Sequence, residues 1–155
     1  MKNENETAGT GRDSRAFGLL DKYRRILQNN DYLISSLDVM EKIPEPSVSQ
    51  RARIQELDER LIPDGIREER DLGGLLRPLV AELQNDGTTA AMRRKAVIEL
   101  RYFSLLEWAQ IAETLFPDDY ADANKKRQRY LIRQAFRYHT AALEQLDALL
   151  RDRGL

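Results

Sequence analysis

Apolar residues recur at steps of three and four along most of the chain, which is the period of an amphipathic α-helix. The first such run predicts a helix from Arg15 to about Lys42. Asp13 or Ser14 can cap its start, and a break near Asn30 is an alternative. The alternation typical of a half-buried strand is absent from the sequence. The pattern therefore predicts an all-α fold.

Proline and glycine divide the rest of the first half. They predict breaks at Pro44-Glu45-Pro46, Ile62-Pro63-Asp64-Gly65, Gly73-Gly74 and Pro78. Helices are therefore expected from about Ser47 to Leu61 and, as two short pieces, from Ile66 to Asn85. Residues 15–86 are predicted to form a helical arm with narrow apolar stripes. Such stripes are typical of a bundle within one chain or of a coiled-coil-like element that pairs two chains, and both alternatives stay open.

The second half predicts three helices in close succession. Thr88 or Thr89 can cap the first, Ala90 to Phe103, whose apolar face is Met92, Val97, Leu100 and Phe103. Ser104-Leu105-Leu106 ends it, and Glu107 to Phe116 forms a short helix with one apolar stripe: Trp108, Ile111, Ala112, Leu115 and Phe116. The small side chain of Ala112 within that stripe allows a following helix to cross closely.

A long helix is predicted after a polar loop from Pro117 to Ala123. It runs from about Asn124 to Arg151, and its expected apolar face is Ile132, Ala135, Phe136, His139, Leu143, Leu146 and Leu150. A short supporting helix followed by such a helix is the order that a helix-turn-helix requires. Residues 88–155 are therefore predicted to be a helix-turn-helix domain.

Charge is distributed unevenly, although the net charge is only −1. Residues 91–137 contain ten basic and six acidic side chains, whereas residues 1–90 are net acidic. Six cations of the long helix, with no acid between them, form its basic part: Lys125, Lys126, Arg127, Arg129, Arg133 and Arg137. At 100° per residue, Lys126, Arg129, Arg133 and Arg137 lie within about 80° of one another. This pattern predicts a DNA-binding edge, with phosphate or base contacts from Lys125, Lys126, Gln128, Arg129, Tyr130, Arg133 and Arg137.

The sequence gives little support for a catalytic, metal or cofactor site. There is no cysteine, and the single histidine, His139, lies on the predicted apolar face, which favours a structural role. Trp108 shares a stripe with Ile111 and is expected to anchor the core. The acids of the 117–123 loop lack the glycine and distal glutamate of a calcium site. We therefore expect no catalytic activity, no metal and no cofactor.

Several of these residues carry a resemblance to a known family. The stretch Val97-Ile98-Glu99-Leu100-Arg101-Tyr102, followed by Glu107-Trp108-Ala109-Gln110-Ile111-Ala112-Glu113, is similar to region 4 of sigma factors. It looks most like phage-encoded sigma-like regulators of the ArpU and RinA type, whose ending also resembles the run from His139 to Leu146. The resemblance covers about Met92 to Leu149 and implies control of phage gene transcription. Phe116-Pro117 replaces the usual glycine, and the connection from Pro117 to Ala123 is longer than a tight three- or four-residue turn.

The sequence thus predicts a sequence-specific transcriptional regulator of phage or prophage origin that binds double-stranded DNA. RNA polymerase and a second copy of the chain are candidate partners. The alternatives are a small terminase subunit for DNA packaging and a helical adaptor that binds protein without DNA affinity. No apolar stretch approaches the ~20 residues of a membrane span. Residues 1–14 resemble a disordered tail and lack the apolar segment of a signal peptide. A cytoplasmic location is therefore expected.

Overall fold

The structure is a computed structural model that describes residues 13–84 and 86–155. It is all-α, as the sequence predicts. The α-helices are α2 (Arg15–Glu41), α3 (Val48–Glu56), α4 (Ile62–Ala81), α5 (Thr89–Ile98), α6 (Trp108–Leu115), α7 (Pro117–Ala121) and α8 (Lys125–Asp152). Two π-turns, η1 (Leu57–Leu61) and η3 (Glu99–Phe103), extend α3 and α5, and a 3₁₀ turn, η2 (Glu82–Gln84), follows α4.

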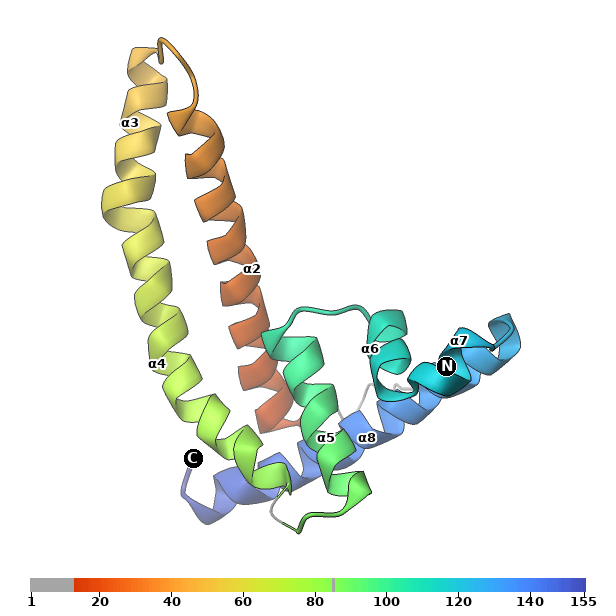
Figure 1. Cartoon of the computed structure of the whole chain (residues 1–155). Helices are drawn as coiled ribbons and strands as arrows, with labels where there is room; N and C mark the ends of the chain where they lie inside the picture. Colours follow the sequence, from red (N-terminus) through yellow and green to blue (C-terminus); the bar gives the residue numbers. More distant parts are fainter. Residues whose placement is uncertain (1–12, 85) are drawn as a thin grey trace.

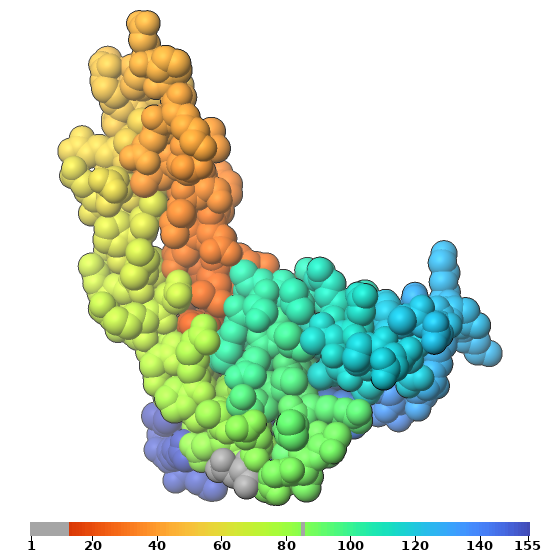
Figure 2. All heavy atoms as spheres, in the orientation of Figure 1, coloured from red at the N-terminus to blue at the C-terminus, as the bar shows by residue number. Residues whose placement is uncertain are grey.

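An antiparallel helical hairpin stands out from the rest of the molecule as a long arm (Figures 1 and 2). Its first side is α2, which begins after Ser14, whose side chain accepts a hydrogen bond from the Phe17 amide. The helix continues to Glu41, so the alternative of a break near Asn30 is wrong. The second side is formed by α3, η1 and α4 in one run, and Ser47 caps its start.

The second side of the arm differs from the sequence prediction. Ile62-Pro63-Asp64-Gly65 is not a turn, and Gly73-Gly74 does not interrupt the helix. The wide π-turn η1 lies directly before Pro63, which has no N–H for the bond that an unbroken α-helix requires at that position. Pro78, the other predicted interruption, also lies inside α4, which continues to Ala81.

Two glycines of α4 mark places where the arm's helices approach closely. A Cβ atom on Gly65 would lie 2.0 Å from Oδ1 of Asn30, and one on Gly73 would lie 2.8 Å from the Tyr23 hydroxyl. Asn30 is buried, and its Nδ2 donates to the Gly65 carbonyl (2.9 Å) and to Glu69 Oε1 (3.0 Å). These glycines therefore make room for polar side chains of α2.

One apolar cluster unites the foot of the arm with the second half of α8. It contains residues from α2, α4, η2, α5, η3 and α8: Ala16, Leu20, Tyr23, Leu76, Leu79, Val80, Leu83, Ile98, Tyr102, Ala142, Leu143, Leu146 and Leu150. Asp147 of α8 also accepts a hydrogen bond from the Ala16 amide (2.7 Å), at the N-terminus of α2. The arm is thus anchored on the helix that carries the basic side chains.

The helices of the second half begin and end near the predicted positions. Thr88 caps α5, and Asn124 caps α8. Their apolar faces are partly different, because Met92 and Phe136 are exposed, whereas Leu131 and Ala142 are buried. The predicted loop from Pro117 to Ala123 contains a short helix, α7.

No helix within residues 13–84 and 86–155 is long and apolar enough to cross a membrane. The same residues contain no group of three or more potential metal-ligating side chains. Most of the predicted tail, residues 1–12, lies outside the described residues. Ser14, by contrast, is a buried helix cap.

The close approach within the arm can be tested by three alanine substitutions. Gly65→Ala and Gly73→Ala should each lower the free energy of unfolding by about 1–3 kcal/mol, because the added Cβ displaces a buried side chain. Gly74→Ala is the matched control, since its Cβ would meet nothing within 4 Å. The control should raise stability by up to about 1 kcal/mol, through helix propensity alone. Equal melting curves for all three variants would contradict the close approach.

Candidate nucleic-acid interface

The short helix α6 is held against α8 by a small apolar cluster. Ile111 and Ala112 of α6 are fully buried. Ile111, Val97 of α5 and Ala135 of α8 form the centre of the cluster, with Leu100, Leu106, Trp108, Leu115 and Tyr138 around it. Glu107 caps α6 in a reciprocal arrangement with Gln110. The pairing of α6 with α8 therefore fixes the inner face of α8 about three turns from its N-terminus.

Aromatic side chains extend this contact on one side. The Trp108 ring lies 4.4 Å from the Phe136 ring and 5.1 Å from the His139 ring, measured between centroids. His139 Nε2 is 2.7 Å from the Tyr102 hydroxyl, and the two rings stack. Tyr102 belongs to the π-turn η3. The position of α8 is thus tied to both α6 and η3.

Burial controls the protonation of this pair. Removal from water lowers the pKa of His139 to about 4, and the nearby Arg101 adds a smaller effect in the same direction. Burial also raises the pKa of Tyr102 above its ordinary value. Near neutral pH the imidazole is therefore neutral and the phenol protonated, which agrees with the structural role predicted for His139.

A network of arginines connects the arm to the start of α6. Arg24 of α2 donates from Nε to the Arg101 carbonyl (3.3 Å), and its Nη2 lies 3.5 Å from Glu107 Oε2. Arg101 donates to the Leu106 carbonyl and lies over the Trp108 ring, 5.1 Å from its centroid. Desolvation, with Arg24 as a second cause, lowers the pKa of Arg101. The sequence pattern did not predict this network, which depends on Arg24, 77 residues before Arg101.

The connection from α6 to α8 is compact, although it is longer than a tight turn. Phe116 ends α6, and Pro117 begins α7. The Arg93 guanidinium lies 5.1 Å from the Phe116 ring centroid and donates to the Tyr138 hydroxyl (3.1 Å). Asn124 then caps α8 by accepting from the Arg127 amide (2.9 Å). The first turns of α8 consequently lie beside α7, at the end of the molecule away from the arm (Figure 1).

Four of the predicted DNA-contacting residues share the outer side of α8. We call Lys126, Arg129, Arg133 and Arg137 the basic edge. All four are exposed, and they lie about 120–200° around the helix from the buried Ala135. Among the described residues, none of the four has an ion-pair partner, in contrast to many arginines of the arm. The basic edge ends at Glu144, which occupies the same side two turns beyond Arg137.

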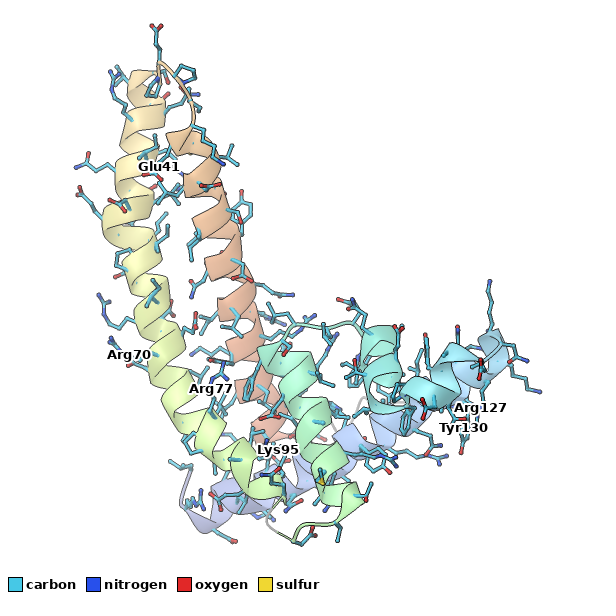
Figure 3. All side chains as sticks on the ribbon, viewed as in Figure 1. Glu41, Arg70, Arg77, Lys95, Arg127 and Tyr130 are labelled. Atoms are coloured by element: carbon cyan, nitrogen blue, oxygen red, sulfur yellow. The ribbon has the colours of Figure 1, made fainter. Side chains whose placement is uncertain are left out.

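The remaining predicted residues lie beside this edge or away from it. Tyr130 is half-exposed, and the guanidinium of Arg127 lies 4.8 Å from its ring centroid (Figure 3). Arg127 is itself paired with Asp119 of α7 (3.2 Å). Lys125 is exposed but is turned toward the inner half of the helix circumference. Gln128 is partly buried, and its Nε2 lies 3.4 Å from the Ala123 carbonyl, so it points toward the connection.

Comparison of the chain with known protein families, with curated proteins and with solved structures finds no match.

The buried histidine gives the fold a characteristic pH dependence. Because His139 has a pKa of about 4 in the folded protein and ~6.5 when unfolded, the unfolded chain takes up the extra proton as the pH falls between these values. The free energy of unfolding should therefore decrease from pH 6.5 to pH 4, by at most about 3 kcal/mol from this group. In His139→Gln, denaturant unfolding should depend less on pH within this window.

Tyr102→Phe serves as the control, because it removes the hydrogen bond and leaves the imidazole buried. This variant should keep the wild-type pH dependence while losing some stability. If His139→Gln and the wild-type protein showed the same pH profile, the neutral buried imidazole would be refuted.

Proposed function

We propose that this protein binds double-stranded DNA through the basic edge of α8 and acts as a transcriptional regulator. The observation that carries the proposal is the line of four exposed cations without ion-pair partners among the described residues. Such cations replace the counterions of the phosphate backbone, and this gives sequence-independent affinity. Several other cations of the chain do have an acid within reach, for example Arg60 with Glu56 and Arg67 with Asp64.

The arrangement of α6 and α8 supports the interpretation that these two helices form a helix-turn-helix. In such motifs a supporting helix crosses a recognition helix, and the outer side of the recognition helix enters the major groove. Here α6 covers the inner side of α8 at Ala135, and the basic edge occupies the outer side. The intervening α7 and the Phe116-Pro117 junction depart from a tight turn, so we assign DNA contact to the outer side of α8 and not to the connection.

The resemblance to sigma region 4 leads to the more specific form of this proposal. A phage or prophage regulator of the ArpU and RinA type would act in the cytoplasm and would have RNA polymerase as a further partner. The projecting arm is then the part of the chain available to that partner or to a second copy. DNA packaging and a purely protein-binding adaptor remain the competing functions, and the following experiment separates the adaptor from the other two.

Salt dependence is the direct test of phosphate contact. If the four cations of the basic edge each neutralise one phosphate, a plot of log K against log salt should have a slope of about −4. Arg129→Ala with Arg133→Ala should flatten this slope by about two units. Fluorescence anisotropy with duplex DNA from the protein's own genomic neighbourhood measures the slope.

The matched control is Arg67→Ala with Arg70→Ala, which removes the same charge from an exposed part of the arm. It should leave the slope unchanged, and both double variants should fold as well as the wild type, because exposed charges contribute little to stability. Equal slopes for the two double variants would show that the basic edge does not touch phosphate. A folded wild-type protein without DNA affinity at about 50 mM salt would favour the adaptor.

A further inference from the structure

One large apolar side chain lies directly beside the basic edge. Phe136 is 41% exposed, although the sequence pattern assigns it to the core. It follows Arg129 by seven residues, so the two lie on nearly the same line along α8, about 20° apart. Arg133 precedes it by one turn, and Thr140 follows it by one turn. A molecule large enough to span Arg129 and Arg133 can therefore also reach the Phe136 ring.

The exposed ring has a fixed position. It packs on Trp108 with 4.4 Å between centroids and an angle of 47° between planes. Trp108 is held in turn by contacts with His139 and Arg101. A side chain anchored in this way loses little conformational freedom on binding, which favours a specific contact.

Phe136 differs from the other large apolar side chains that are exposed. Tyr32, Val39 and Val48 lie on the arm, and Met92 lies on α5. Tyr130 of α8 is near the basic edge, but the Arg127 guanidinium is 4.8 Å from its ring centroid. Among the described residues of α8, Tyr130 and Phe136 are the large exposed hydrophobic side chains, and Phe136 is the one without a hydroxyl group.

We infer that Phe136 contacts the C5 methyl group of a thymine in the major groove of duplex DNA and so makes binding depend on sequence. This inference rests on the proposed function and goes beyond it, because the cations alone recognise any phosphate backbone. In the major groove, thymine presents a methyl group, which favours apolar partners such as phenylalanine. The positive charges of Arg129 and Arg133 beside Phe136 can pair with phosphates. An apolar protein surface docked on Phe136 would leave these charges without a partner.

The dimensions of the basic edge agree with a duplex as the ligand. From Lys126 to Arg137 the helix rises by about 16 Å, at 1.5 Å per residue. The major groove is about 12 Å wide and admits one α-helix. Arg129 and Phe136 are about 10 Å apart along the axis, which corresponds to roughly three base-pair steps of 3.4 Å. Phosphate contacts and one base contact can therefore be made together.

Replacement of thymine by deoxyuridine tests the inference, since it removes only the methyl group. A binding duplex is first enriched from a random pool, and each thymine is then replaced in turn. At one position or a few adjacent ones, the wild-type protein should lose about fourfold in affinity, the value of one buried methyl group. Phe136→Ala should bind the thymine and deoxyuridine duplexes equally well.

Two further variants control for structural effects. Phe136→Leu keeps an apolar contact and should retain part of the discrimination between the two duplexes. Met92→Ala truncates another exposed apolar side chain, 58% exposed, far from the basic edge in sequence. It should discriminate as the wild type does. A melting curve for each variant reports whether loss of the Trp108 contact unfolds the protein, and a folded Phe136→Leu protein keeps the test valid in that case.

The outcomes separate this inference from the proposed function. Wild-type binding without loss at any deoxyuridine position would overturn the methyl contact and leave DNA binding intact. The same would follow if Phe136→Ala lost affinity at the same positions as the wild type. Enrichment of single strands in place of duplexes would also overturn it, in favour of base stacking on the ring. Failure to enrich any DNA with folded protein would overturn both proposals.

Discussion

The structure depends on a single apolar face of α8. The middle of this face packs on α6 and α5 at Ala135, and its second half packs on the foot of the arm through Leu143, Leu146 and Leu150. Because both clusters use the same side of the helix, the opposite side is left to solvent. The basic edge is therefore a consequence of how α8 is held, and the exposed cations need no partner within the chain.

The same packing connects the arm to the proposed DNA-binding surface. Asp147 of α8 accepts a hydrogen bond from the Ala16 amide at the start of α2, and Arg24 of α2 contacts both Arg101 and Glu107. The first contact joins the arm to the second half of α8, and the second joins it to the residues directly before α6. A partner that binds the projecting hairpin thus acts on an element that is packed directly against α8.

Much of this architecture follows from the sequence, and the errors have clear physical causes. The period of the apolar residues and the caps Ser14, Thr88 and Asn124 place most helix ends to within a few residues. Glycine is ambiguous, however, since Gly65 and Gly73 could break a helix or admit a neighbour. Only the position of Asn30 and Tyr23 on the facing helix decides this, and it is a tertiary property. Likewise, a π-turn before Pro63 leaves no pattern in the apolar positions.

The candidate site was likewise predicted in part from the sequence. The cations of α8 can be placed on one side of a helix by counting residues, and the structure leaves them exposed. Counting does not determine where the apolar face ends. Phe136 lies at the margin of that face, where its ring packs on Trp108 of α6 and stays 41% exposed. Leu131 is buried near the start of α8, although the sequence pattern does not assign it to the apolar face.

Site-directed cross-linking tests the central claim, that DNA lies along the outer side of α8, most directly. The chain has no cysteine, so single cysteines can carry a photoreactive group without further changes. Thr140→Cys places the group one turn beyond Phe136, and Val48→Cys places it on a residue 76% exposed near the tip of the arm. The account predicts that bound duplex DNA is cross-linked from position 140 and not from position 48. Cross-linking from position 48 alone, with DNA bound and position 140 silent, would contradict it.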